Sequence, residues 1–187
     1  MIDSIKKAAD ILRHGGIILY PTDTVWGIGC DATNDDAIKK LYKLKQKDAG
    51  AASLILVSDI NMIYKYVHTV PDIAVQLVEI SDKPLTVVFP NACGVSSELM
   101  ASDGSLGIRL VNHEYCNSLI RAIKRPLVST SANLSGMPAP QSFSEISKAI
   151  IEGVDFVVDA KYAGKMTGKP SSIIKTGLSG EVKIIRN

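Results

Sequence analysis

The feature that most constrains the fold is the alternation of short, continuously apolar runs with segments of helical periodicity. Ile17-Ile18-Leu19-Tyr20 and Leu54-Ile55-Leu56-Val57 are two such runs, and a helical pattern lies between them. A strand that is apolar on both faces is typical of a sheet covered by helices. Several late runs follow one another with no helix between them, which indicates mixed parallel and antiparallel pairing. We therefore expect an α/β fold, with residues 1–187 in a single domain.

Periodicity, capping residues and the positions of Gly and Pro predict the individual elements. The expected helices are 2–14, a segment that begins at 33–36 and ends in the basic run 43–47, 71–80, 113–124, and one that begins at Ser142 with Glu145 completing a capping box. The expected strands are 17–20, 54–57, 85–89, 107–111, 127–130, 154–158, 172–175 and 182–185.

Charge and cysteine usage limit the classes of function. The chain has 21 Lys and Arg against 19 Asp and Glu, a net charge of +2, whereas dedicated nucleic-acid binders have a stronger basic bias. Its three cysteines form no CxxC pair, so neither a zinc site nor a disulfide framework is predicted. The N-terminus lacks an apolar signal core, and no apolar run approaches the length of a membrane span. We expect a cytoplasmic protein without membrane contact.

The segment 20–27 is the first candidate for chemistry. Its sequence, Tyr-Pro-Thr-Asp-Thr-Val-Trp-Gly, places hydroxyls and a carboxylate directly after a buried strand. Ligands of open α/β sheets bind at the carboxyl ends of strands. The alternative is an ordinary strand-to-strand turn, in which Thr and Asp satisfy local backbone groups. Taken alone, the segment favours the turn.

The segment 128–136 is a second hydroxyl-rich stretch, and it also follows a predicted strand. Four hydroxyls and an amide lie within the seven residues from Ser129 to Ser135. Small polar side chains and open backbone amides suit the recognition of phosphate or carboxylate. A Ser-rich loop whose hydroxyls cap a turn explains the pattern equally well.

Basic residues extend the candidate set. Lys43, Lys45 and Lys47 are flexible point charges suited to phosphate, although cations are also typical of a solvated helix C-terminus. Arg109 lies inside the apolar strand 107–111, between Ile and Leu. A guanidinium in that position needs either an internal ion pair or a ligand.

Established catalytic signatures are absent from the sequence. Gly164–Lys169 resembles a P-loop, but it has three residues between its glycines instead of four, and Pro170 follows the lysine. No GxSxG, HExxH or GxGxxG motif occurs. His14, His68 and His113 lie far apart and outside the candidate segments. We therefore expect none of these histidines to be catalytic and no metal-ligating cluster.

Taken together, the candidate segments resemble the YrdC-like family of threonylcarbamoyl-AMP synthases over nearly the whole chain. The matching segments are 20–27, 44–47, 105–109, 129–133, 170–174 and 185–186. The resemblance implies a twisted mixed sheet with a basic concave face. It also implies ATP with Mg²⁺, L-threonine and bicarbonate as ligands. The implied products are pyrophosphate and threonylcarbamoyl-AMP, the latter for the threonylcarbamoyladenosine modification of tRNA.

The resemblance further implies which residues form the site. Those for L-threonine are Thr24, Arg109, Ser129 and Ser171, with Arg109 on the carboxylate. Those for ATP are Lys45, Lys47, Ser105, Ser131, Asn133 and Arg186. In the reaction that the resemblance implies, a carbamate oxygen of the substrate is the nucleophile, so no catalytic side chain is expected. The protein has to align two anions and neutralise growing charge. Possible RNA or tRNA contact, and the proteins that transfer the product to tRNA, are implied as partners.

The chain departs from the family pattern at four places, one of which is Ala139, where some relatives have a serine near the nucleotide. The family usually has Lys-x-Arg where this chain has Lys45-Gln46-Lys47, and lysine loses the two-pronged hydrogen bonding of arginine. The segment 48–53 is small and nearly uncharged where the family commonly has polar or basic residues. Trp26 stands where Tyr or Phe is usual.

Two alternatives stay open at this point. The first is a YrdC-like paralogue that binds RNA, double-stranded RNA included, and has no synthase activity; the altered motif at 45–47 favours it. The second is a carbamoyl transferase like the related domain of hydrogenase-maturation proteins. That domain normally belongs to a longer chain with zinc-finger segments, which this sequence lacks.

Overall fold

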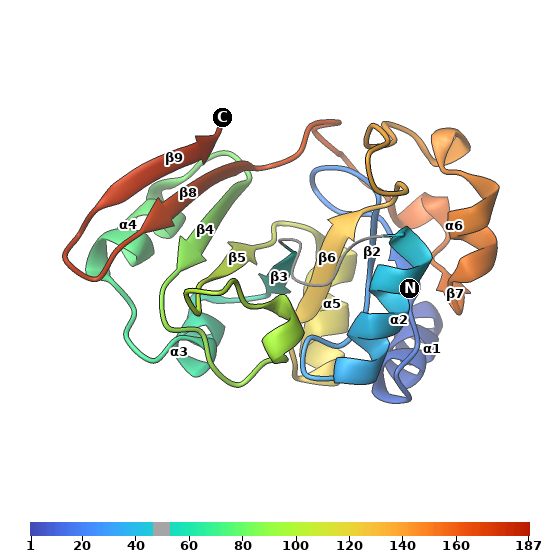
Figure 1. The fold of residues 1–187 in the computed structure, drawn as a ribbon. Helices are drawn as coiled ribbons and strands as arrows, with labels where there is room; N and C mark the ends of the chain where they lie inside the picture. Colours follow the sequence, from blue (N-terminus) through green and yellow to red (C-terminus); the bar gives the residue numbers. More distant parts are fainter. Residues whose placement is uncertain (47–52) are drawn as a thin grey trace.

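One mixed sheet organises the molecule. The computed structural model describes residues 1–46 and 53–187, whose strands form a nine-stranded sheet in the order β7-β1-β2-β6-β3-β5-β4-β8-β9 (Figure 1). The pairs β1–β7, β3–β5 and β4–β8 are parallel, and the remaining pairs are antiparallel. The strands are β1 Ile18–Tyr20, β2 Gly27–Gly29, β3 Leu54–Val57, β4 Leu85–Phe89, β5 Leu106–Leu110, β6 Leu127–Ser131, β7 Phe156–Val157, β8 Ser172–Thr176 and β9 Val182–Arg186. The predicted mixed α/β sheet is confirmed.

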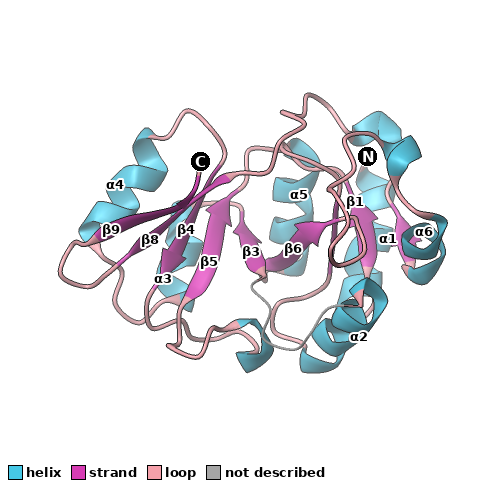
Figure 2. Ribbon diagram, turned by 45° about the horizontal axis from the view of Figure 1, so that its top comes forward, coloured by secondary structure: helices cyan, strands magenta, loops and turns pink. Residues whose placement is uncertain are grey.

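Helices flank this sheet. They are α1 Ile2–Arg13, α2 Asp35–Lys45, α3 Ile63–Tyr66, α4 Asp72–Ile80, α5 Glu114–Ile123 and α6 Lys148–Gly153. α1 packs against α5 and β1, α5 against β3, α2 against β2, and α4 against β4 (Figure 2). None of the helices in the described residues has the length and apolar character that crossing a bilayer requires.

Local chemistry explains where α1 and α2 begin and end. The Asn34 side chain accepts a hydrogen bond from the Ala37 amide at 3.0 Å and caps α2. Asp35 and Asp36 place negative charge in its first turn, where the helix dipole favours it. α1 stops before Gly15, whose φ of 76° lies in the left-handed region that glycine adopts without strain.

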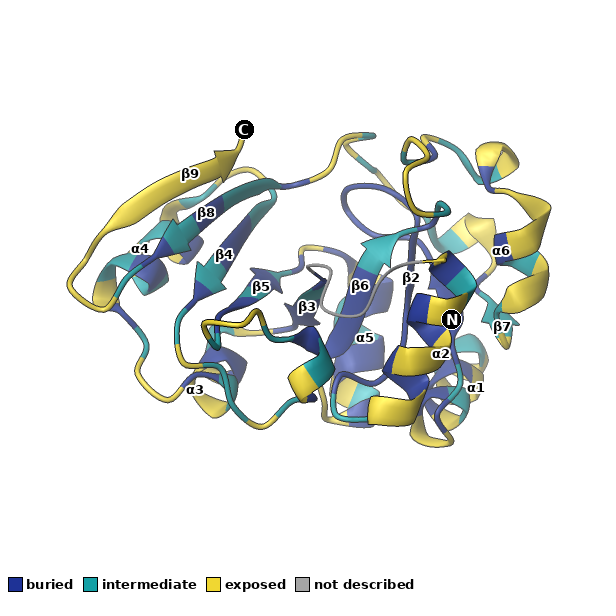
Figure 3. Ribbon diagram, in the orientation of Figure 1, coloured by how far each residue is buried: buried dark blue, intermediate teal, exposed yellow. Residues whose placement is uncertain are grey.

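The core lies where the central strands meet the helices. All three residues of β1 and of β2 are buried, whereas all five of β9 are exposed at the far edge of the sheet (Figure 3). Trp26 is also buried, and its ring meets that of Phe143 edge-on with the centroids 5.0 Å apart. The indole that departs from the family pattern therefore belongs to the core.

Two local predictions were wrong or incomplete. The helix expected from Ser142 is only a 3-10 turn, Phe143–Glu145, and α6 begins at Lys148. The Glu145 carboxylate does accept from the Gln141 amide and the Ser142 hydroxyl, but the backbone returns to an extended conformation at Ile146 and Ser147, which ends the turn. The strand β2 was not predicted, because three residues that include two glycines carry little strand signal.

Candidate functional site

A cavity of about 410 Å³ lies over the middle of the sheet, within the size range of ligand pockets. Segments far apart in the sequence line it: the loop before β2, the strands β5 and β6, the residues just before β8, and the end of β9. Seven of the ten residues predicted for binding line this cavity: Thr24, Ser105, Arg109, Ser129, Ser131, Ser171 and Arg186. Lys47 falls outside the described residues.

The loop between β1 and β2 presents the first group of polar atoms. The Thr22 hydroxyl lies 2.8 Å from the Val25 carbonyl, 3.0 Å from the Thr24 amide and 2.8 Å from the Thr24 hydroxyl. Residues 167–168 also hold this loop. The amides of Thr167 and Gly168 donate to the carbonyls of Asp23 and Thr24, both at 2.9 Å. The loop therefore does join two antiparallel strands, as the turn alternative requires, and it also lines the cavity.

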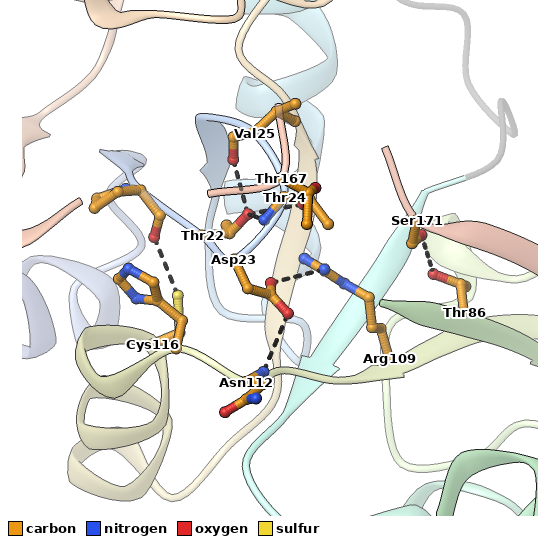
Figure 4. Close-up of polar contacts among 12 residues, drawn as sticks. Thr22, Asp23, Thr24, Val25, Thr86, Arg109, Asn112, Cys116, Thr167 and Ser171 are labelled. Carbon is orange, nitrogen blue, oxygen red and sulfur yellow. Dashed lines mark hydrogen bonds and ion pairs between the residues drawn. The ribbon is translucent and has the colours of Figure 1, made fainter. Parts of the chain in front are cut away.

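Arg109 reaches this loop from β5. Its Nη1 donates to Asp23 Oδ1 at 2.8 Å, and Asp23 Oδ2 accepts from the Asn112 amide at 3.2 Å (Figure 4). The Arg109 side chain is 3% exposed, and its Nε has no hydrogen-bond partner among the described residues. The ion pair that the sequence left open is thus present, and it leaves donor capacity on the same guanidinium at the edge of the cavity.

Lys45 lies behind the loop that follows β6. It is 3% exposed, and its ammonium donates to the carbonyls of Ser131 at 2.5 Å and Asn133 at 2.7 Å. The Ser131 hydroxyl donates to the Asn133 side chain, whose amide in turn donates to the carbonyls of Leu134 and Met137. Lys45 and Asn133 therefore hold Ser131 and the loop that follows it, and a phosphate contact by Lys45 or Asn133 stays a prediction.

The opposite wall is held by a second hydroxyl pair. The hydroxyls of Thr86 on β4 and Ser171 lie 2.7 Å apart, across the cavity from the Thr22–Thr24 loop (Figure 4). The Arg186 guanidinium donates twice to the Ser171 carbonyl, from Nε at 3.1 Å and from Nη2 at 2.8 Å. The partial burial of its guanidinium against Ser171 lowers the pKa of Arg186 from its ordinary value. The end of β9 is thereby tied to the residues that precede β8.

Ser105 is held at the start of β5 by a carboxylate. Asp103 Oδ1 accepts from both the amide of Ser105, at 3.0 Å, and its hydroxyl, at 2.6 Å. Lys175 on β8 donates to the other carboxylate oxygen. That hydrogen bond, with those from Ser105, holds the pKa of Asp103 well below its usual range. The Ser105 hydroxyl proton is therefore directed at Asp103, which fixes the orientation of this side chain in the cavity lining.

The groups beneath the β1–β2 loop are neutral. Burial raises the pKa of the Tyr20 phenol, and burial likewise raises the pKa of the Cys116 thiol. Tyr20 donates to the Val128 carbonyl at 3.1 Å, and Cys116 donates to the Pro21 carbonyl at 3.2 Å. Neither group offers an ionised nucleophile at neutral pH, so the chemistry of the cavity rests on hydroxyls and guanidinium groups.

Sequence reasoning missed four residues that position the predicted ones: Thr22, Thr86, Asp103 and Asp23. Thr22 and Asp23 lie inside the first candidate segment, and its density of polar atoms was the available signal. Thr86 and Asp103 carry no comparable signal, because their partners come from segments distant in the sequence or from a turn.

A larger groove, of about 1410 Å³, lies on the other side of Asp23. Its charged lining is mixed: Glu79, Asp82, Lys83, Glu114, Lys161 and Lys165. Apart from Asp23 itself, it shares no residue with the ion pair and the hydroxyl pairs described above. The size of this groove is the only argument for placing the functional site there. In the smaller cavity, polar groups held by hydrogen bonds converge from several segments, so we assign the functional site to the smaller cavity.

Asp23→Asn is expected to lower the free energy of unfolding by about 3 kcal/mol, because it leaves the buried Arg109 charge without its counter-ion. Denaturant unfolding followed by circular dichroism measures this. The control is Glu152→Gln, which removes the exposed pair with Lys148 and should leave stability close to wild type. Equal unfolding midpoints for the two variants would show that the ion pair contributes nothing.

The comparisons with known proteins find relatives over most of this chain. A family model for Sua5, YciO and YrdC proteins, described as "Telomere recombination", matches residues 10–187. A threonylcarbamoyl-AMP synthase of Idiomarina loihiensis is 32% identical over 177 residues, 93% of this chain and 94% of that protein.

Solved structures show the same fold. P. abyssi Sua5, in a crystal structure complexed with L-threonine, is 26% identical with a TM-score of 0.83 over 91% of this chain, which spans about half, 50%, of that protein's length. E. coli YciO, at 23% identity and a TM-score of 0.83, covers 98% of this chain and is covered over 88% of its own, which is a likeness of fold. The match of the family model over residues 10–187 and the identity to the Idiomarina protein establish that this chain belongs to the Sua5/YciO/YrdC family.

Proposed function

We propose that this chain makes threonylcarbamoyl-AMP and pyrophosphate from L-threonine, bicarbonate and ATP, for the threonylcarbamoyladenosine modification of tRNA. The observation that carries the proposal is the convergence of the buried Arg109 guanidinium with the hydroxyls of Thr24, Ser129 and Ser171 in one cavity. A fixed guanidinium beside hydroxyls suits an amino acid, which brings one carboxylate and several polar groups. The name of the Idiomarina relative and the L-threonine complex of Sua5 support this choice of substrate.

In the proposed reaction, the amine of threonine first attacks the carbon of bicarbonate and forms a carbamate with loss of water. A carbamate oxygen then bonds to the α-phosphorus of ATP while the bond from that phosphorus to the pyrophosphate oxygen breaks. Arg109 holds the threonine carboxylate. Ser105, Ser131 and Arg186 line the nucleotide side, where the Arg186 guanidinium has N–H donors beyond the two that it gives to the Ser171 carbonyl, and these would stabilise charge on the phosphate oxygens. The nucleophile belongs to the substrate, so alignment is the main contribution of the protein.

Mg²⁺ enters this proposal with ATP. No group of three His, Cys, Asp or Glu side chains that suits a metal ion occurs in residues 1–46 and 53–187. The lining instead offers hydroxyl oxygens, which are hard ligands compatible with a Mg²⁺ ion held mainly by phosphates. When bound, the ion neutralises phosphate charge.

The comparisons favour the synthase over an RNA-binding paralogue without synthase activity. We place the reaction in the cytoplasm, where the product passes to the proteins that transfer the threonylcarbamoyl group to tRNA.

The test is pyrophosphate release from ATP by purified protein with Mg²⁺ and bicarbonate. Release is expected to depend on L-threonine and to stop when EDTA removes Mg²⁺. Mass spectrometry of the product should show threonylcarbamoyl-AMP. Folded protein that releases no pyrophosphate in response to L-threonine would refute the proposed function, and salt-dependent RNA binding would then be measured instead.

A further inference from the structure

Thr22 lies behind Thr24 and has all of its hydrogen-bonding capacity occupied. A hydroxyl has one proton to donate and two lone pairs to accept with. The Val25 carbonyl, 2.8 Å away, can only accept, so it takes the Thr22 proton. The Thr24 amide, 3.0 Å away, can only donate, so it occupies one lone pair of the Thr22 oxygen.

Because Thr22 has no further proton to donate, the direction of the hydrogen bond between the Thr22 and Thr24 hydroxyls can be deduced. The two hydroxyl oxygens lie 2.8 Å apart, so one of them donates to the other. The Thr22 proton is already committed to a carbonyl, so Thr24 is the donor and fills the second lone pair of Thr22. Thr24 then has no proton left for the cavity, and its oxygen meets a ligand only as an acceptor.

We propose that Thr22 is a positioning residue that locks Thr24 as a hydrogen-bond acceptor and thereby sets which end of the substrate faces the β1–β2 loop. This inference rests on the proposed function. A substrate group at Thr24 must be a donor, which in threonine means the amino group or the β-hydroxyl. The carboxylate is an acceptor and is excluded from Thr24, while Arg109, joined to the same loop through Asp23, supplies donors.

Burial makes this polarity stable. Thr22 is 1% exposed and Thr24 is 4% exposed, so little water reaches the hydrogen bond between the two hydroxyls. The amides of Thr167 and Gly168 hold the carbonyls of Asp23 and Thr24 from outside, which keeps the loop from turning the hydroxyls over. A preformed acceptor beside a preformed donor distinguishes the two ends of an amino acid without any movement of the protein.

Thr22→Val tests the inference, because valine keeps the shape and removes only the hydroxyl. Thr24 then loses its acceptor and is free to turn its proton toward the substrate. We expect affinity for L-threonine, measured by calorimetry on the full chain, to fall by about tenfold or more, with ATP affinity within about twofold of wild type. Thr22→Ser restores the hydroxyl and should restore threonine affinity. The control is Thr33→Val, because the Thr33 hydroxyl makes a similar turn contact with Asp31 outside the cavity.

L-2-Aminobutyrate, which lacks the β-hydroxyl, identifies the donor. If the hydroxyl of threonine meets Thr24, the preference for threonine over aminobutyrate should collapse in Thr22→Val. If the amino group meets it, both ligands should weaken by the same factor. Unchanged threonine affinity in Thr22→Val, an equal loss for ATP, or failure of Thr22→Ser to recover would overturn the inference. Wild-type protein that does not bind L-threonine at all would overturn the proposed function and this inference together.

Discussion

Arg109→Ala is expected to lower threonine-dependent pyrophosphate release by about 100-fold or more. In the proposed site the guanidinium makes a charge-assisted, two-pronged contact with the threonine carboxylate, and losing such a contact costs about 3 kcal/mol. Steady-state kinetics measure this, with L-threonine and ATP varied separately. Arg109→Lys should recover only part of the activity, because an ammonium keeps the charge without the planar pairing.

The control for Arg109 removes another arginine–aspartate ion pair, one whose arginine side chain is 52% exposed instead of 3%. Arg125 donates to Asp31, a carboxylate whose side chain is 3% exposed, at 2.6 Å, and it is absent from the cavity lining. Arg125→Ala should therefore lose stability without a specific loss of threonine-dependent turnover. Because Arg109→Ala also leaves Asp23 unpaired, the folded fraction of each variant is measured by circular dichroism before rates are compared. Wild-type turnover in folded Arg109→Ala would remove this residue from the threonine site.

Gly29→Ala is expected to prevent stable folding or to lower the melting temperature by more than about 10 °C. A Cβ at this position would lie 1.7 Å from the Val128 carbonyl oxygen, a backbone atom that cannot turn aside as a side chain does. Close approach of two backbones is a common reason for glycine inside a strand. The alanine has to push β2 away from β6, which breaks the middle of the sheet.

Gly27→Ala is the matched control within the same strand. A Cβ there would lie 3.4 Å from the Ser129 hydroxyl oxygen, which is ordinary contact. Its stability should stay within about 1 kcal/mol of wild type, although its activity is expected to fall because residue 27 lines the cavity. Thermal melting of both variants decides the matter. Similar melting temperatures for the two would mean that β2 and β6 separate at little cost.

Much of the fold was predictable from local patterns. Strands such as 54–57 and 85–89 appear as apolar runs. Asn34 and the acidic residues after it indicate the start of α2. The exceptions have local causes. β2 is too short and too rich in glycine to show a strand pattern, and the capping signal at Ser142 started a turn that the following extended backbone ended.

Most of the residues that line the candidate site were predictable from the sequence, but their hydrogen-bond partners were not. Seven predicted residues do line one cavity. Lys45, however, looked like a solvated or phosphate-binding charge at a helix end, and in the structure its ammonium lies against the carbonyls of Ser131 and Asn133. Those partners are more than eighty residues away in the sequence, so no local pattern predicts them.

The sequence by itself indicated the resemblance to the family, most of the strands and helices along the chain, and the segments that carry polar chemistry, because each of these is a pattern of neighbouring residues. Only the tertiary structure decided that Arg109 pairs with Asp23, that the hydroxyls of Thr22 and Thr24 lie within hydrogen-bond distance, and that seven of the predicted residues line one cavity. The reason is physical: hydrogen-bond partners and burial depend on distances that exist only after strands far apart in the chain have paired.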